Sequence, residues 1–214
     1  MPLLHNGDHL TLAEFERRYS AQPHIKKAEL IEGVVYVPSP VSLEHSRRHA
    51  NVMLWLGTYH AVTPGLRLLD NATIKLDAEN EVQPDAALCV AEGGQTSAAG
   101  AYLQGAPELV VEIASSSAAY DLHEKLRVYR RTGVREYVVL LTLERETVWF
   151  RLDEGQYERI APDEDGIIQS AVFPGLDFDS AKFWDDDLPG LLAILGAGLS
   201  SEAHATFTST LRAA

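Results

Sequence analysis

Cysteine is nearly absent from this sequence, which has one, Cys89, in 214 residues. A single cysteine excludes an intrachain disulfide and every zinc or iron–sulfur site that needs several cysteine ligands. A chain without disulfides suits the reducing cytoplasm, so we expect a cytoplasmic protein. Cys89 itself lies in an apolar run, and we expect it to be a core residue.

Long apolar segments are missing as well. The first ten residues lack the basic start and the apolar core of a signal peptide. The longest apolar stretch, LPGLLAILGAG from Leu188, is far shorter than the roughly 20 residues that span a bilayer. We therefore expect no membrane partner, and we interpret this stretch as either a short packed helix or a dimer contact.

Basic side chains are scarce. The chain has 18 Lys and Arg against 31 Asp and Glu, a net charge of −13. Domains that bind nucleic acid by general electrostatics are usually basic, and an anionic membrane surface would repel this chain. The deficit is local, because residues 153–187 hold 2 basic and 11 acidic side chains, whereas residues 1–152 have a net charge of −4.

The hydrophobic pattern predicts an α/β (α+β) domain with a mixed central sheet. We expect one domain over 1–187, with its core at about 29–150, and a C-terminal helical extension at 188–214. Residues 91–107 are rich in glycine and small side chains and are expected to form a mobile loop. The strands are expected at 66–70, 72–77, 85–90, 108–113 and 135–141, with hairpins across 32–33 and 153–155. The helices are expected at 11–21, 42–60 and 120–132. The residues expected on the apolar face of the second helix are Leu43, Ala50, Met53, Leu54 and Leu56.

Glu112 stands inside LVVEI, an apolar run that is typical of a central strand buried on both faces. A carboxylate at such a position must be paired, protonated or metal-bound, because burying a bare charge costs several kcal/mol. An ion pair with a core lysine or arginine would account for it as well as a functional site would.

Three further charged residues accompany Glu112. Asp85 begins a second apolar run, where a carboxylate either faces a cleft or simply ends a turn. Lys125 lies at the edge of the inward stripe of its helix, four residues after Asp121, with which it can pair. Its ammonium either snorkels to the surface or points at the carboxylates of the sheet. Glu29 lies within a short strand and could face the same cleft.

Two acids on neighbouring strands, a third acid and a lysine make an oxygen-rich site that suits Mg²⁺ or Mn²⁺ better than zinc. Such a site supports hydrolysis of a phosphate ester, because the metal polarises a phosphoryl oxygen and acidifies a water that the lysine orients or deprotonates.

His45 and His49 have the spacing of two zinc ligands on a helix, but no HExxH motif begins at His45. This absence favours histidines on the helix surface or on the substrate side.

Five segments occur in a specific order between 29 and 150. They are ELIEG from Glu29, a histidine (His45) five residues after a Ser-Pro pair, QPD ending at Asp85, ELVVEIASSS around Glu112, and D-x-x-x-K-x-x-x-Y-x-x-x-G-V-x-E-Y from Asp121. In this set the chain resembles the Uma-type restriction endonucleases of the PD-(D/E)XK nuclease superfamily. The resemblance implies a restriction-endonuclease-like fold, with helices flanking a mixed sheet, and metal-dependent cleavage of phosphodiester bonds.

The resemblance also implies roles for individual residues. Ala114 stands where the superfamily motif has its lysine. The resemblance implies that the lysine is supplied instead by the following helix. The implied catalytic residues are Glu29, Asp85, Glu112 and Lys125. The implied ligands of Mg²⁺ or Mn²⁺ are Glu29, Asp85, Glu112 and the main-chain carbonyl of Ile113. The residues expected to contact substrate are His45 and Gln83, joined by Arg127 and Arg130, which lie on the outer face of the predicted helix and could meet a phosphate backbone.

DNA is the expected substrate, with RNA left open. A homodimer is expected because paired cuts in a duplex need two active sites and twofold pairing is the commonest symmetry. One alternative is a nuclease fold kept as a catalytically inactive binding or regulatory module, which the net charge of −13 favours. A second alternative is a metal-dependent hydrolase of a small phosphate ester.

Overall fold

The computed structural model describes residues 2–115 and 117–213. Within these residues the strands form two six-stranded sheets and a two-stranded ribbon. The first sheet has the order β2–β1–β5–β4–β8–β7, with bounds Val34–Tyr36, Glu29–Ile31, Glu81–Val82, Ile74–Lys75, Tyr102–Gln104 and Ser97–Ala99. The second has the order β12–β11–β10–β9–β6–β3, with bounds Gln156–Arg159, Glu146–Asp153, Glu136–Leu141, Leu109–Ala114, Ala86–Val90 and Leu66–Asp70. The ribbon pairs β13 (Ile167–Gln169) with β14 (Asp177–Asp179).

Both large sheets are mixed, as predicted. The pairs β9–β10 and β4–β8 are parallel, whereas their other neighbours are antiparallel. The chain passes from the first sheet to the second over residues 83–85, between β5 and β6. Asp85 therefore lies where the two sheets meet.

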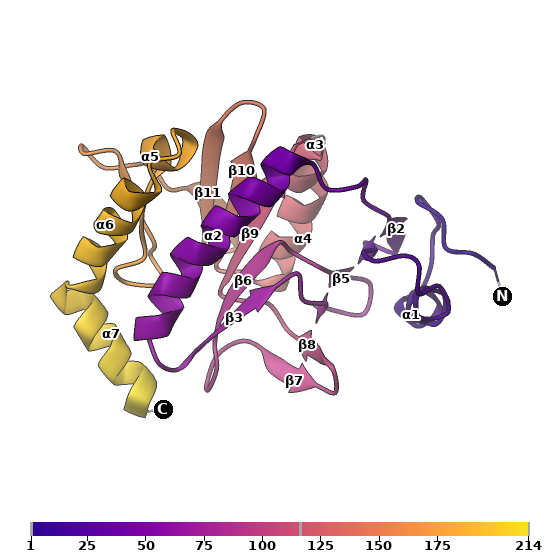
Figure 1. Ribbon diagram of the computed structural model, residues 1–214. Helices are drawn as coiled ribbons and strands as arrows, with labels where there is room; N and C mark the ends of the chain where they lie inside the picture. The colour runs from indigo at the N-terminus through magenta and orange to yellow at the C-terminus, as the bar shows by residue number, and fades with distance from the viewer. Residues whose placement is uncertain (1, 116, 214) are drawn as a thin grey trace.

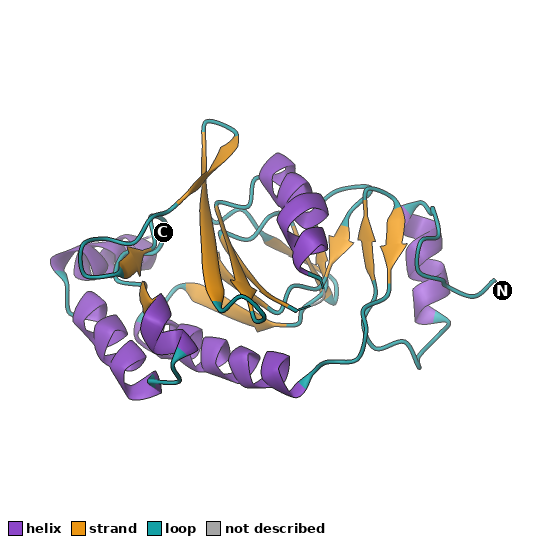
Figure 2. Ribbon diagram, turned by 90° about the horizontal axis from the view of Figure 1, so that it is seen from above, coloured by secondary structure: helices purple, strands orange, loops and turns teal. Residues whose placement is uncertain are grey.

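Helices lie on both sides of the strands (Figures 1 and 2). The long helix α2 crosses one face of the second sheet, with α6 and α7 beside it, and the α3–η1–α4 segment covers the other face. The helix bounds are α1 Leu12–Ser20, α2 Leu43–Val62, α3 Ala118–Tyr120, the π-helical turn η1 Asp121–Lys125, α4 Leu126–Thr132, α5 Ser180–Trp184, α6 Leu188–Leu199 and α7 Glu202–Ala213.

Alternation along β9 divides the interior into two cores. Val111 and Ile113 belong to the core under α2, whereas Val110 and Ala114 belong to the core under α4. Successive side chains of a strand point to opposite faces of its sheet. Glu112 therefore points toward the helix that carries Lys125.

Caps and turns begin and end several elements where the sequence predicted. Thr11 Oγ1 accepts a hydrogen bond from the main-chain N–H of Glu14 at 3.3 Å, which starts α1. Glu32 and Gly33 have φ of 51° and 75°, the left-handed values that a two-residue hairpin turn requires. Gly133, with φ of 93°, ends α4. The hairpin across 153–155 is also confirmed.

Two predictions about strands were wrong. Residues 91–107 contain the β7–β8 hairpin instead of a loop alone, and β8 joins the first sheet through its parallel pairing with β4. Their small residues, such as Ser97 and Ala98, carry little strand propensity, so tertiary pairing decides the outcome. The strand expected at 72–77 is reduced to Ile74–Lys75, and Glu81–Val82 forms an unpredicted strand.

The predicted inner face of α2 was also largely wrong. Leu43 and Leu54 are 87% and 45% exposed, because the buried stripe of the helix is rotated toward its aromatic residues. Leu56 is buried as predicted, and Met53 packs against the core. The residues that α2 buries are Arg48, Val52, Trp55, Leu56 and Tyr59.

The apolar stretch that begins at Leu188 is a packed helix. Leu191 and Leu195 of α6 are fully buried in the core that also contains Trp55. None of the helices in the described ranges has the length and apolar character needed to cross a bilayer. Cys89 is buried, as predicted.

Candidate active site

An open cleft of about 830 Å³ lies at the junction of the two large sheets, against the first turns of α2. The structure brings all four residues of the predicted catalytic set to this cleft. They come from different elements of the fold: Glu29 from β1, Asp85 from the β5–β6 connection, Glu112 from β9 and Lys125 from η1.

Glu112 and Lys125 form a buried ion pair at the floor of the cleft. Lys125 Nζ lies 2.7 Å from Glu112 Oε1, and both side chains are nearly inaccessible to solvent. The hydroxyl of Tyr129 donates a second hydrogen bond, of 3.0 Å, to the same Glu112 oxygen. Lys125 ends the π-helical turn η1, a local widening that is frequent at functional sites.

Glu29 completes the environment of this lysine. Its Oε2 lies 3.0 Å from Lys125 Nζ, and its Oε1 accepts the main-chain N–H of Gln83 at 2.8 Å. Asp121 Oδ1 lies 3.7 Å from the same ammonium, as the spacing of four residues predicted. Three carboxylates thus surround Lys125, and both oxygens of Glu29 are engaged.

Asp85 has a different environment on each of its two oxygens. Oδ2 accepts the main-chain N–H of Ile113 at 2.8 Å, which ties the β5–β6 connection to β9. Oδ1 lies 3.4 Å from Lys27 Nζ and 3.4 Å from His45 Nε2. One oxygen of Asp85 therefore makes a structural contact, and the other faces Lys27 and His45 at the cleft.

The environments push the pKa values of the two central acids apart. Burial, opposed by the charge of Lys125, raises the pKa of Glu112 to about 8. Burial also disfavours ionised Asp85, but the contact with His45 and the charge of Lys27 hold its pKa well below the ordinary value. Burial disfavours the charged form of Lys125, yet Glu112 and Glu29 raise its pKa well above normal. Asp85 is therefore an anion and Lys125 a cation at neutral pH.

Both histidines of the i, i+4 pair face the site. His45 lies near Asp85 Oδ1 and the main chain of Ile113, and the hydrogen bond with Asp85, opposed by burial, raises its pKa. His49 Nε2 contacts the main-chain oxygen of Asp85 at 3.0 Å and Asp70 Oδ1 at 3.2 Å. Both histidines therefore line the cleft.

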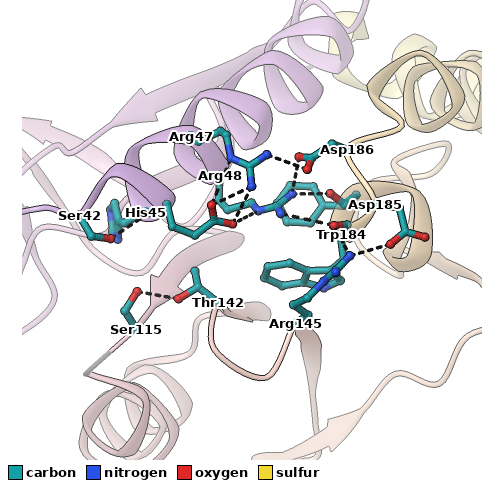
Figure 3. Close-up of polar contacts among 12 residues, drawn as sticks. Ser42, His45, Arg47, Arg48, Ser115, Thr142, Arg145, Trp184, Asp185 and Asp186 are labelled. Atoms are coloured by element: carbon teal, nitrogen blue, oxygen red, sulfur yellow. Dashed lines mark hydrogen bonds and ion pairs between the residues drawn. The ribbon is translucent and has the colours of Figure 1, made fainter.

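A clamp of arginine side chains fixes the end of α2 that carries these histidines (Figure 3). Ser42 caps the helix by accepting the N–H of His45 at 3.1 Å. Two turns on, the buried Arg48 donates to the carbonyl of Phe183 at 2.7 Å and to Asp186 at 2.9 Å, and its guanidinium lies over the Trp184 ring at 5.0 Å. The turn between α5 and α6 therefore sets the direction of α2 at the cleft.

The cleft holds some of the oxygen ligands that a divalent cation requires. Among the described residues, no group of three or more His, Cys, Asp or Glu side chains is arranged to hold a metal ion. Asp85, Glu112 and Ile113 nevertheless border the cleft together, and carboxylate and carbonyl oxygens are the ligands that Mg²⁺ prefers. Mg²⁺ commonly binds through one or two carboxylates, with water and substrate phosphate completing its shell. Two carboxylates and a carbonyl fit that pattern, whereas Glu29 is already engaged by Lys125 and Gln83.

Three residues predicted to contact substrate lie outside the cleft lining. The Gln83 amide donates to Tyr19 and Thr73 beneath the first sheet. Arg127 is on the exposed face of α4, where it pairs with Glu32 at 3.1 Å. Arg130 donates to Gln156 on β12. Helical periodicity puts the two arginines on the outer face of the helix, but it does not specify which element each of them contacts.

Two contributors were not anticipated from the sequence. Lys27 lines the cleft beside Asp85, and Tyr129 holds Glu112. Lys27 is two residues before Glu29 in an extended segment, so both side chains point to the same side, and this spacing was the available signal. Tyr129 is the tyrosine of the motif that begins at Asp121, but the sequence alone does not indicate its contact with Glu112.

Comparisons with known proteins agree with the fold. A family model described as "Uma2: Putative restriction endonuclease" matches residues 12–181. Among solved structures, the chain is similar to a protein of Anabaena variabilis ATCC 29413 described as a putative nuclease belonging to DUF820, with a TM-score of 0.59 and 14% sequence identity. The match covers 84% of this chain and 97% of that one. The search of curated proteins found no match. The predicted restriction-endonuclease-like fold class, a mixed sheet flanked by helices, is confirmed.

Proposed function

Because the chain belongs to the Uma2 family of putative restriction endonucleases, we propose that it is a metal-dependent endonuclease that hydrolyses phosphodiester bonds of DNA. The observation that carries the proposal is that Asp85 and Glu112 border one cleft. The main-chain N–H of Ile113, the residue after Glu112, donates a hydrogen bond to Asp85 and ties the two positions together. A low-pKa carboxylate beside a high-pKa carboxylate is a common arrangement in catalytic sites.

Each residue has a distinct part in this proposal. Asp85, Glu112 and the Ile113 carbonyl would hold Mg²⁺ or Mn²⁺, which supplies Lewis acidity to a phosphoryl oxygen and to water. Lys125 and Tyr129 fix the orientation of the Glu112 carboxylate through its Oε1. Glu29 in turn fixes Lys125. His45, 19% exposed at the cleft, is available to contact the substrate.

The hydrolysis consumes one water. The water oxygen bonds to phosphorus while the bond from phosphorus to the leaving ester oxygen breaks, and that oxygen keeps the bonding electron pair. The water releases a proton, and the leaving oxygen takes one up. The acids of the site remain unchanged over the full cycle.

The test is cleavage of plasmid DNA, single-stranded DNA and RNA with Mg²⁺, with Mn²⁺ and with EDTA. We expect cleavage of DNA only with metal, and a loss of roughly 100-fold or more in Glu112→Gln. The exposed Glu158, which pairs with Arg151, provides the control, and Glu158→Gln should cleave like the wild type. Equal rates for wild type and Glu112→Gln would remove this site from the explanation.

A second arm of the same experiment measures metal binding without turnover. Ligand binding to the native state alone stabilises it by about 2.7 kcal/mol at 100 times the dissociation constant. We expect Mn²⁺ to raise the melting temperature of the wild type and Asp85→Ala to abolish the increase. No increase in the wild type would favour the inactive binding module.

The proposed working unit is a cytoplasmic homodimer. The single buried cysteine supports the compartment. The apolar stretch of α6 is largely engaged with the core, so its inward leucines do not supply the dimer surface. Sedimentation equilibrium of the full chain tests the oligomeric state.

A further inference from the structure

Two lysines reach the acids of this site, and they differ in exposure. The side chain of Lys125 is 3% exposed, whereas that of Lys27 is 25% exposed. Lys125 reaches the floor of the cleft from η1, and Lys27 lies on the segment that leads into β1. The spacing of the motif indicates Lys125 as the lysine that contacts the substrate, whereas the contacts of the two side chains favour Lys27.

Lys125 is enclosed by its acidic partners. A lysine ammonium has three donor hydrogens, and three carboxylates surround this one, with oxygens at 2.7, 3.0 and 3.7 Å on Glu112, Glu29 and Asp121. Contact with a substrate would require it to leave a buried carboxylate uncompensated, which is strongly unfavourable. These contacts suit a residue that positions Glu112.

Lys27 has donor hydrogens to spare. Over the described residues, its one ion pair is the 3.4 Å contact with Asp85 Oδ1, and the rest of its ammonium lies at the cleft. The same Asp85 oxygen faces His45, so an ammonium and an imidazole, both able to donate hydrogen bonds, lie where an anionic phosphate would bind. Charge-assisted hydrogen bonds from such groups are the strong ones in phosphate recognition.

We propose that Lys27 is the catalytic lysine, and that its ammonium donates to a non-bridging oxygen of the scissile phosphate. Lys27 keeps its protons throughout and stabilises the negative charge on the phosphoryl oxygens as the water attacks. Lys125 is then a positioning residue that acts through Glu112. This inference rests on the proposed nuclease function and names which lysine serves it.

The assignment has a consequence apart from activity. Lys27 and a divalent cation compete for Asp85 Oδ1, since both are positive ions at one oxygen. Removing the ammonium should therefore favour metal binding while it slows cleavage. A residue that only maintained the shape of the cleft would weaken both together.

The experiment uses the full chain and measures two quantities, the single-turnover rate of DNA cleavage with Mn²⁺ and the affinity for Mn²⁺ alone by titration calorimetry. Lys27→Met should slow cleavage by roughly 100-fold or more while Mn²⁺ binds at least as tightly as in the wild type. Lys27→Arg, which keeps the charge, should recover part of the rate. Lys182, which pairs with Asp187 at the surface, is the control, and Lys182→Met should change neither quantity.

Several results would overturn the inference. An unchanged rate in Lys27→Met would refute it and leave the nuclease proposal standing, as would a joint fall of rate and Mn²⁺ affinity. Absence of cleavage by the wild type with either metal would remove the proposed function and this inference with it. If Lys27→Met does not melt cooperatively, Lys27→Gln takes its place under the same expectations.

Discussion

At the residue scale, the most informative position is Glu112, because its burial demands a partner. The carboxylate is 3% exposed in a strand whose other residues are all buried. Its partner turns out to be a lysine that two further acids also contact. The ion pair that explains the burial and the cleft that suggests a function are therefore parts of one arrangement.

Removing the Lys125 ammonium should destabilise the fold. Lys125→Met leaves Glu112, Glu29 and Asp121 buried without their cation, and breaking a buried pair in this way costs about 3–5 kcal/mol. The loss should be smaller at pH 5 than at pH 8. Without the ammonium, burial raises the pKa values of Glu112 and Asp121 further, and a protonated acid needs no cation. A raised native-state pKa adds stability at low pH that is lost as the pH rises through it. Urea unfolding at both pH values measures the effect.

The matched control is Arg127→Met. Arg127 is 56% exposed and pairs with Glu32 on the surface, and such pairs contribute at most about 1 kcal/mol. A Lys125→Met variant as stable as this control would show that the three acids do not depend on the lysine.

The candidate site illustrates what a sequence can and cannot specify at this scale. Glu112 and Lys125 could be found because a charge in an apolar strand and a lysine beside an inward stripe are local anomalies. Lys27 could not be paired with Asp85 in this way, because 58 residues separate them and the contact exists only once the two sheets meet. The outer face of the α4 arginines follows from helical periodicity, but their partners Glu32 and Gln156 come from other elements and could not be predicted in this way.

At the element scale, the periodicity of the sequence predicted where helices and strands occur better than it predicted what each of them packs against. The strands β6, β9 and β10 are continuous apolar runs and were predicted within a residue or two. The β7–β8 hairpin was missed because it is held by pairing with the distant β4. The buried face of α2 was only partly predicted, because it holds Leu56 together with a buried arginine and three aromatic or β-branched residues, whereas Leu43 and Leu54 are exposed.

Arg48 links α2 to the turn between α5 and α6, and a mutation can test this link. Its guanidinium satisfies the carbonyls of Phe183 and Trp184 and contacts Asp186. Arg48→Met removes the buried hydrogen bonds from a charged donor to these carbonyls and to Asp186, at about 1–3 kcal/mol. Arg48→Lys should not restore the loss, because one ammonium cannot reproduce the planar fork. Thermal or urea unfolding checks this.

The neighbouring arginine provides the comparison for Arg48. Arg47 also contacts Asp186, but both of these side chains are 45% exposed, so Arg47→Met should cost less than about 1 kcal/mol. Equal effects of the two substitutions would show that the clamp does not fix α2.

At the scale of the whole molecule, the net charge of −13 has to be reconciled with a polyanionic substrate. Part of the acidity is compensated locally, since Asp185 and Asp186 pair with Arg145 and Arg47 beside α2 (Figure 3). The cleft itself presents Lys27 and His45. Attraction for DNA is thus confined to a few cationic groups on an acidic surface.

This charge distribution predicts that DNA binding depends on both metal and salt. With EDTA, the anionic Asp85 faces the phosphate with no metal ion between them, and we expect no binding of a labelled 20-nucleotide strand at micromolar protein. With Ca²⁺, which has the same charge and oxygen preference as Mg²⁺ but tolerates looser geometry, binding should become measurable by fluorescence anisotropy. It should weaken as sodium chloride rises from 50 to 200 mM, with a log–log slope near −0.7 for each phosphate neutralised on a single strand. Because few cations face the cleft, few phosphates are neutralised, and we expect a log–log slope of about −1 to −2 in total. Tight binding in EDTA, or a slope as steep as that of a strongly basic DNA-binding protein, would mean that another surface carries the nucleic acid.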